Sequence, residues 1–382
     1  MDFDATWDDR HRAAAETLIP WIESAVPLAG KTVLEYGCGN GPVACALAAR
    51  AGRHLGYDIS AEAIARGRAT VAERGLDNVE LRHAPVESIL SAVEQHADEV
   101  DVFVFYAVLE HMTVEERLEV LALARRVVRE DGAIIICETP NRLILWDWHS
   151  SQAPFIAQLP DELALRYYDR APRQDYIDTV RAGLAQSWEA GQEALTRFGR
   201  GMSYHELELV FGDLSQHVIA SNWEPELMRR RDIHVEELGL ARMMDQTRPD
   251  LAPAFSRYWL DVVLSAAPVA SPPRMLRPWP LHTLTSHGAQ WTGNESVWLP
   301  HPGVHLNVEL PVATDRVVVG VVPASWGRAT VRLDPGGSPR MQQGVDCDGP
   351  PGYVTFRLPQ PLQTFKLDLD APGQVMFVGY DC

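Results

Sequence analysis

Between about residues 31 and 138, two patterns of apolar and polar positions follow one another in turn: short apolar runs and longer segments with helical spacing. Short apolar or β-branched runs, typical of buried strands, cover 33–36, 54–58, 79–83, 101–106 and 133–137. The longer segments between them place apolar residues at helical spacing, over 42–50, 60–75 and 113–130. This alternation predicts an α/β fold: a doubly wound, mostly parallel sheet with helices on both faces.

The pattern changes after the fifth strand. Residues 146–200 contain helical spacing without a strand, which predicts a helical insertion. A helix resumes at Ser203, where Glu206 completes a capping box like that of Thr113 and Glu116. Two further apolar runs, 217–223 and 258–268, would bring the sheet to seven strands.

Beyond a proline-rich linker at 271–280, helical spacing disappears. Period-two runs separated by Gly and Pro predict an all-β sandwich over 281–382. The expected domains are therefore 1–270, carrying the insertion, and 281–382.

Composition and charge restrict the classes of protein to which the chain can belong. Of 382 residues, 46% are hydrophobic and 23% charged, as in folded soluble proteins. No apolar run approaches a membrane span, and the acidic start lacks the layout of a signal peptide. Five scattered cysteines indicate reduced thiols, so we expect a cytoplasmic protein. A net charge of −18 disfavours nucleic-acid binding.

The stretch VLEYGCGNGP places alternating glycines between a strand and a helix. Glycines there allow a sharp turn and close approach of a ligand to an electropositive helix start. A dinucleotide fingerprint would need Gly or Ala at position 42, where Pro42 stands, so a dehydrogenase is disfavoured. Asp58 ends the next strand, where it can accept both hydroxyls of a ribose.

With these motifs, and FYAVLEHM after the fourth strand, the chain resembles the class I S-adenosylmethionine-dependent methyltransferases. The resemblance implies S-adenosyl-L-methionine as cofactor. It implies that Asp58 binds the ribose, that Ile59 packs on adenine and that Tyr106 lies near the transferred methyl. It also implies that the loop facing the methionine part comprises Glu35, Tyr36, Gly37, Gly39 and Gly41.

Two positions depart from the family pattern. An acidic residue that receives the adenine amino group is replaced by Pro85, so adenine would rely on the backbone near Val86 or on Glu87. Some RNA-methylating relatives bind a divalent ion through ExxEH, but Ala107 stands at the first acidic position. We therefore expect no metal site.

The stretch TPNRLILWDWHSSQAPF follows the fifth strand, at the edge where ligands bind in doubly wound sheets. Trp146 and Trp148 are expected to line the acceptor pocket, with the insertion as a lid; alternatively they only attach the insertion to the sheet. His149 is nominated as general base, oriented by Asp147. His111 is the reserve, unless it only stabilises its loop.

These features predict methylation of a hydroxyl on a sugar, glycan or other small molecule. A weaker likeness to bacterial methyltransferases of polysaccharide modification favours glycans. N- or carboxyl-methylation and a non-catalytic cofactor-binding module remain alternatives. Two roles suit the sandwich: association between copies, or carbohydrate binding through Trp291, Trp298 and Trp326, unless these are core residues.

Overall fold

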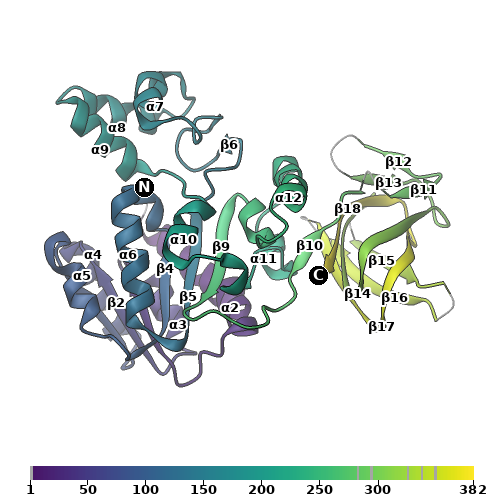
Figure 1. Ribbon diagram of the computed structural model, residues 1–382, viewed down its shortest axis with the longest axis horizontal. Helices are drawn as coiled ribbons and strands as arrows, with labels where there is room; N and C mark the ends of the chain where they lie inside the picture. Colours follow the sequence, from purple (N-terminus) through teal and green to yellow (C-terminus); the bar gives the residue numbers. More distant parts are fainter. Residues whose placement is uncertain (1–2, 282–283, 293–295, 325–326, 337–338, 348–350) are drawn as a thin grey trace. The chain divides into compact units, whose positions relative to one another are not determined.

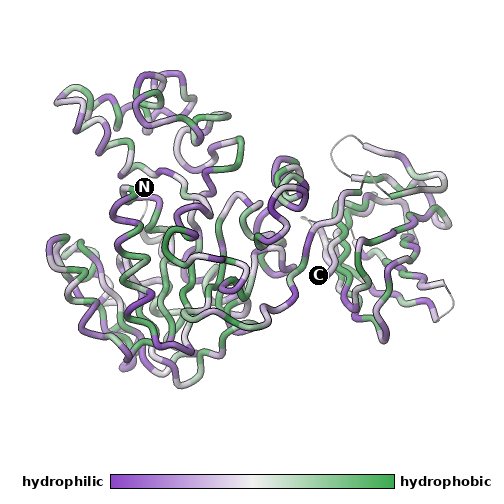
Figure 2. The backbone as a smooth tube through the Cα atoms, in the orientation of Figure 1, coloured by the Kyte–Doolittle hydropathy of each residue, from purple (hydrophilic) through white to green (hydrophobic). Residues whose placement is uncertain are grey.

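The chain divides into two compact units. The computed structural model describes residues 3–281, 284–292, 296–324, 327–336, 339–347 and 351–382 (Figure 1). Unit 1 comprises Met1–Ser221 with Asp250–Pro272, and unit 2 comprises Asn222–Pro249 with Pro273–Cys382. Apolar residues follow the strands of each unit, and polar residues are frequent on the helices and loops outside them (Figure 2).

Unit 1 contains the predicted seven-stranded sheet, in the order β3-β2-β1-β4-β5-β9-β8. The strands β1 to β5 are parallel, and β9 runs antiparallel to both β5 and β8. The doubly wound α/β fold is therefore confirmed. The strands are β1 (Thr32–Tyr36), β2 (Arg53–Asp58), β3 (Val79–His83), β4 (Val100–Tyr106), β5 (Val128–Pro140), β8 (Val218–Ala220) and β9 (Trp259–Ser265).

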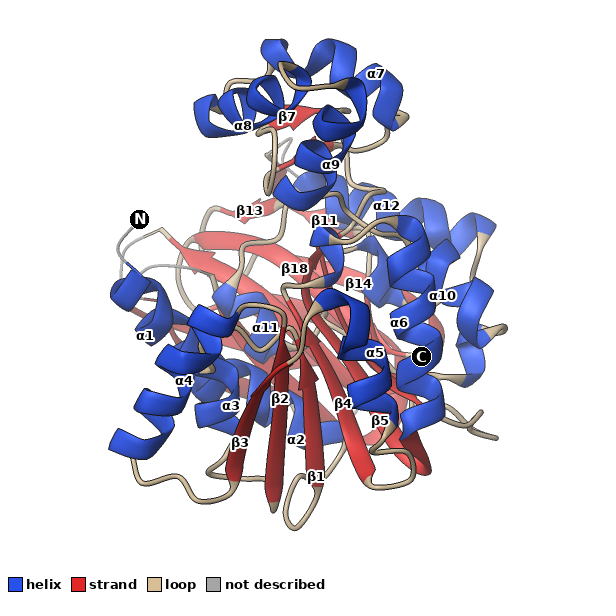
Figure 3. Ribbon diagram, turned by 90° about the vertical axis from the view of Figure 1, so that its left-hand side faces the viewer, coloured by secondary structure: helices blue, strands red, loops and turns tan. Residues whose placement is uncertain are grey.

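Helices cover both faces of this sheet (Figure 3). Both predicted capping boxes are present, with Thr113 Oγ1 accepting from Glu116 N at 3.2 Å and Glu206 accepting from Ser203 N at 3.3 Å. The helices are α1 (Phe3–Ala13), α2 (Ile19–Ala25), α3 (Pro42–Leu47), α4 (Ala61–Glu73), α5 (Val86–Glu94), α6 (Val114–Val127) and α10 (Tyr204–Phe211).

The insertion after β5 is helical, as predicted, and lies above the carboxyl ends of the strands (Figure 3). It begins with a two-stranded ribbon, β6 (Trp146–Asp147) paired with β7 (Ala153–Pro154). Three helices follow: α7 (Asp161–Tyr167), α8 (Gln174–Leu184) and α9 (Trp188–Phe198). Tyr176, Val180 and Leu195 belong to a hydrophobic cluster of the insertion's own.

Unit 2 contains the predicted antiparallel strands. They form one hydrogen-bonded sheet, in which β14 and β17 run antiparallel along almost their whole lengths. Side chains from both halves of β14, such as Val308 and Val319, belong to one core cluster. The principal strands are β13 (Val297–Leu299), β14 (His305–Pro323), β15 (Gly327–Asp334), β16 (Met341–Cys347), β17 (Gly352–Leu369) and β18 (Gly373–Asp381).

Unit 1 ends at Pro272, close to the expected boundary at 270, but residues 222–249 group with unit 2. This segment carries α11 (Pro225–Arg230) and α12 (Val235–Thr247). Trp223 is fully buried and stacks on Phe377 with ring centroids 5.7 Å apart. The sequence predicts one strand over 217–223, but β8 ends at Ala220, and Trp223 packs in the core of unit 2.

Of the three tryptophans considered for carbohydrate binding, two lie among the described residues. Trp291 is 46% exposed and Trp298 is half-buried, whereas Trp326 lies outside the described residues. Within the described ranges, every helix is too short or too polar to cross a membrane.

Candidate active site

The carboxyl ends of β1, β2, β4 and β5 lie at one edge of the sheet, below the insertion (Figure 3). Their register pairs Tyr36 with Tyr57 and with Phe105, and Tyr106 with Cys137. Residues far apart in the sequence therefore meet at this edge, which is where doubly wound sheets bind ligands.

The glycine loop joins β1 to α3 with a left-handed backbone, with φ of 77° at Gly37 and 54° at Gly39. A Cβ atom on Gly37 would lie 2.4 Å from Cγ2 of Val108, so no side chain fits there. A Cβ on Gly39 would meet no atom within 4 Å, so its backbone borders open space. The loop thus offers backbone to a ligand, as a methionine-binding turn requires.

Asp58 is held against this loop. Its Oδ2 accepts from Gly39 N at 2.8 Å and its Oδ1 accepts from Ser60 N at 2.7 Å. Ile59, directly after β2, and Val86, the first residue of α5, are 54% and 58% exposed. Exposed aliphatic side chains beside a fixed carboxylate fit a nucleoside, whose base is apolar on its faces and whose ribose donates hydrogen bonds.

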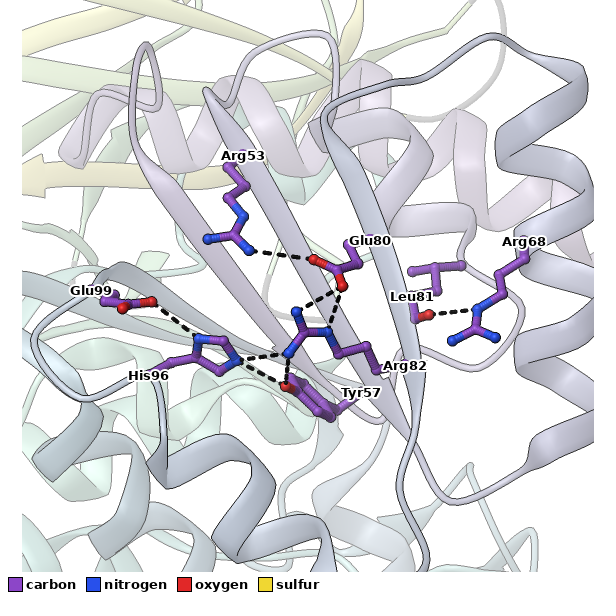
Figure 4. Close-up of polar contacts among 8 residues, drawn as sticks. All are labelled: Arg53, Tyr57, Arg68, Glu80, Leu81, Arg82, His96 and Glu99. Carbon is purple, nitrogen blue, oxygen red and sulfur yellow. Dashed lines mark hydrogen bonds and ion pairs between the residues drawn. The ribbon is translucent and has the colours of Figure 1, made fainter.

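A polar network around the buried Tyr57 and His96 supports the end of β2 (Figure 4). The carbonyl of Tyr57 accepts from Gly37 N at 2.7 Å and from Cys38 N at 3.1 Å. The Tyr57 hydroxyl lies 2.8 Å from Nε2 of His96 and accepts from Arg82 at 2.9 Å. The residue before Asp58 is therefore fixed at both its backbone and its ring.

Glu35 precedes the glycine loop in β1, and Trp7 contacts the loop from α1. Glu35 is only 2% exposed and lies 3.2 Å from His54 Nε2, inside the sheet, so its direct contact with a cofactor stays a prediction. Trp7 donates from Nε1 to the carbonyl of Asn40 at 3.1 Å. The sequence reasoning missed Trp7, because nothing in α1 signals contact with a distant loop.

Glu110, His111 and His149 form a cluster at the same edge. The imidazole centroids lie 5.8 Å apart, and Glu110 Oε1 lies 3.6 Å from His111 Nε2. Nδ1 of His111 is 2.9 Å from the carbonyl of Arg197, and Nδ1 of His149 is 3.1 Å from Ser150 Oγ. Both nominated histidines are therefore brought together.

Burial shifts the pKa of each of the three residues in this cluster. It raises the pKa of Glu110 to about 8, and Glu138 contributes to the rise. Burial also lowers the pKa of His149 to about 4, with a smaller contribution from His111. The pKa of His111 is lowered as well, chiefly by burial. A lowered pKa favours the neutral form of each imidazole, in which one ring nitrogen carries a lone pair.

Asp147 does not orient His149, contrary to the prediction. Its oxygens accept from Ser150 N, Ser151 N and Ser151 Oγ at 2.9, 2.9 and 2.7 Å, so its carboxylate closes the turn. His149 is instead positioned through Ser150, whose hydroxyl donates to the carbonyl of Gly199 at 2.6 Å. An Asp two residues before a His suggested pairing, but the tight turn directs it to the backbone.

The two tryptophans of this stretch lie against each other, with ring centroids 5.1 Å apart. Trp146 is half-buried and lines a small recess together with Asn141 and Tyr258. Trp148 is 43% exposed. Trp146 therefore packs at the base of the insertion, whereas Trp148 is exposed to solvent.

Backbone strain marks the same edge. Ala107, directly after β4, and Glu138, near the end of β5, have φ of 49° and 59°. The Glu138 amide donates to Asp261 Oδ1 at 2.8 Å, and Trp259 meets His149 edge-on at 5.9 Å. Non-glycine residues in this conformation cluster at functional sites. Sequence reasoning missed Glu138, Asp261 and Trp259, since left-handed backbone and contacts from β9 have no local signature.

Comparisons with known proteins identify the family. A family model described as a methyltransferase domain matches residues 28–178. A ubiquinone biosynthesis O-methyltransferase of Aromatoleum aromaticum is 30% identical over 195 residues, half of this chain and 76% of that protein. The corresponding enzyme of Thiobacillus denitrificans is 31% identical over 193 residues, again 50% and 76% of the two chains.

The solved structures similar to part of this chain include magnesium protoporphyrin IX methyltransferase from Synechocystis with bound S-adenosylmethionine. The similar region covers 35% of this chain and 61% of that one. The sequence identity is 20% and the TM-score 0.29.

Proposed function

Because the chain belongs to the class I S-adenosylmethionine-dependent methyltransferases, we propose that it methylates a hydroxyl oxygen of a ring-shaped small-molecule acceptor. S-adenosylmethionine is the cofactor, and its sulfonium supplies the electrophilic methyl group. The observation that carries the choice of oxygen is the pair of imidazoles, His111 and His149, whose ring centroids lie 5.8 Å apart at the carboxyl edge of the sheet. A hydroxyl, unlike a neutral amine or a carboxylate, needs such a group to lose its proton.

The residues assigned to the cofactor divide into three groups. Asp58 would accept hydrogen bonds from the ribose hydroxyls, next to the amides that already hold it. Ile59 and Val86 would cover the adenine with exposed aliphatic surface. The backbone at Gly39 would border the amino-acid part, with Tyr36 and Tyr106 at the ends of β1 and β4 enclosing the methyl.

On the acceptor side, the residues align the hydroxyl oxygen with the methyl carbon and exclude water. As the carbon–oxygen bond forms and the sulfur–methyl bond breaks, the hydroxyl proton moves to the histidine pair. His149 is assigned to this proton, with His111 beside it. The exposed indole of Trp148 provides a flat surface for a ring of the acceptor.

Two acceptor classes suit such a surface: phenols and sugars. The two curated relatives are named for O-methylation in ubiquinone biosynthesis, which favours oxygen as the methylated atom. Glycans remain the second class, and unit 2 is proposed to bind carbohydrate or to join copies of the chain, with Trp291 46% exposed. A cytoplasmic location accords with a biosynthetic methyltransferase.

The test uses S-adenosylmethionine with a labelled methyl group, a fractionated bacterial extract, and panels of phenols and sugars, followed by mass analysis of the product. His149→Ala should lower turnover by about two decades or more while S-adenosylhomocysteine affinity is unchanged. His205→Ala, whose ring stacks on Tyr204 at 4.0 Å outside the cluster, is the control. Unchanged turnover in His149→Ala, or a product methylated on nitrogen or a carboxyl group, would overturn the proposal.

A further inference from the structure

We infer that Glu110, His111 and His149 bind one divalent transition-metal ion beside the methyl-transfer site. Each of the three offers a ligand atom, and these atoms all lie within 4.8 Å of one another. The donors come from two loops, since Glu110 and His111 follow β4 and His149 follows β5. Ala107 left the sequence motif short of one carboxylate, but His149 supplies a third donor from elsewhere.

Both imidazoles are held in the orientation that metal ligands adopt. Nδ1 of His111 faces the carbonyl of Arg197, an acceptor only, so this nitrogen carries the hydrogen and Nε2 is left with its lone pair. Ser150 Oγ donates to the Gly199 carbonyl at 2.6 Å, so it accepts from Nδ1 of His149, again leaving Nε2. Outer hydrogen bonds of this kind fix the tautomer of metal-binding histidines.

Glu110 supplies an independent observation. Its side chain is only 1% exposed, and its Oε2 has no hydrogen-bond partner within the described part of the chain. Leaving a buried carboxylate oxygen unsatisfied costs the desolvation free energy of that oxygen. A cation between this carboxylate and the two imidazoles would satisfy the oxygen where no protein donor does.

The donor set selects the class of ion. Two imidazole nitrogens and one carboxylate suit Zn²⁺, Mn²⁺, Fe²⁺ or Co²⁺, whereas Ca²⁺ and Mg²⁺ prefer oxygen ligands throughout. Three protein ligands also leave coordination positions for an acceptor oxygen. With the ion bound, coordination would use the Nε2 lone pairs of both imidazoles, so the ion would lower the pKa of the bound hydroxyl and its proton would pass to solvent water in place of His149. This last step rests on the proposed function; the binding of the ion does not.

The first experiment measures the ion alone. Full-length protein is stripped with a chelator and titrated with Zn²⁺ by calorimetry and with Mn²⁺ by electron paramagnetic resonance. One saturable equivalent is expected. His149→Ala and Glu110→Gln should weaken binding at least about tenfold, as loss of a ligand would. His205→Ala and His301→Ala, two histidines outside the cluster, should bind like the unaltered protein.

S-adenosylhomocysteine binding by each variant reports whether it is folded, and His111→Ala, at a ligand 41% exposed, serves if Glu110→Gln does not fold. Absence of saturable binding to folded protein, or equal binding by the ligand variants and the controls, overturns the inference. Methyl transfer by metal-stripped protein at the full rate would remove only the catalytic step. Metal binding without any methyl transfer would contradict the proposed function and leave the metal site in place.

Discussion

A Cβ atom on Gly199 would lie 2.6 Å from Cε1 and 2.7 Å from Nδ1 of His149. Gly199 follows α9 with φ of 135°, a conformation that other residues rarely adopt. The carbonyl of the same glycine accepts from Ser150, which positions His149. The last turn of the insertion therefore sets the place of the imidazole, both by contact and through the hydroxyl.

Gly199→Ala should accordingly displace His149. We expect turnover and Zn²⁺ affinity to fall by about tenfold or more, because a shift of about 1 Å in a catalytic group is costly. Affinity for S-adenosylhomocysteine should stay unchanged, since the glycine loop is separate. Gly212→Ala is the matched control: it follows α10 with φ of 81°, and its Cβ would meet no atom within 4 Å. Equal losses in both variants would show that backbone strain, and not the contact with His149, is responsible.

Asp58→Ala should weaken S-adenosylhomocysteine binding by about ten- to a hundredfold, because charge-assisted hydrogen bonds contribute about 1.5–3 kcal/mol. Calorimetry measures the affinity, and thermal unfolding without ligand shows whether the loop between Gly39 and Ser60 has changed. Asp77→Asn, at an exposed position after α4, is the control. Wild-type affinity in Asp58→Ala would remove the ribose assignment.

The fold could be predicted where the signal is local. The strands of unit 1 are short runs within single segments, and a capping box such as Thr113 with Glu116 needs only four neighbouring residues. The affiliation of residues 222–249 could not be predicted, because the partner of Trp223 is Phe377, far along the chain. Nothing near Trp223 in the sequence distinguishes the end of a strand of unit 1 from a side chain in the core of unit 2.

The site divides in the same way. Gly39 and Asp58 stand at strand ends, and parallel strands bring such ends to one edge, so their proximity followed from the pattern. The orientation of His149 depends on Ser150, whose hydroxyl donates to the carbonyl of Gly199 and accepts from the imidazole. Asp147 is closer in sequence, but the turn gives it three donors of its own, and Gly199 from the far end of the insertion takes its place.

Trp223→Ala tests the division into units. Removing a fully buried indole should cost about 3–5 kcal/mol, and the loss should fall on unit 2. In scanning calorimetry, S-adenosylhomocysteine raises the transition of unit 1 by mass action and so identifies it. We expect Trp223→Ala to lower the other transition only. A drop in the ligand-sensitive transition would instead place residues 222–249 with unit 1.

Asp101 predicts a specific dependence of stability on pH. Its carboxylate accepts from Thr32 N and pairs with Lys31 Nζ, each at 2.9 Å, at the start of β4. Burial by itself would raise the pKa of Asp101, but the Thr32 amide and the Lys31 ammonium outweigh it and hold the pKa below its ordinary value.

A depressed pKa stabilises the folded state above the unfolded pKa of about 3.9, and this contribution is lost as the pH falls through the folded value. Asp101→Asn should therefore be less stable than the unaltered protein by about 1–2 kcal/mol at pH 7, with the difference shrinking as the pH is lowered below about 4. Thermal unfolding between neutral and acidic pH measures it. Asp131→Asn, 73% exposed beside Arg129, should show little difference at any pH. A difference for Asp101→Asn that stays constant below pH 4 would mean that the carboxylate contributes by shape and not by its charge.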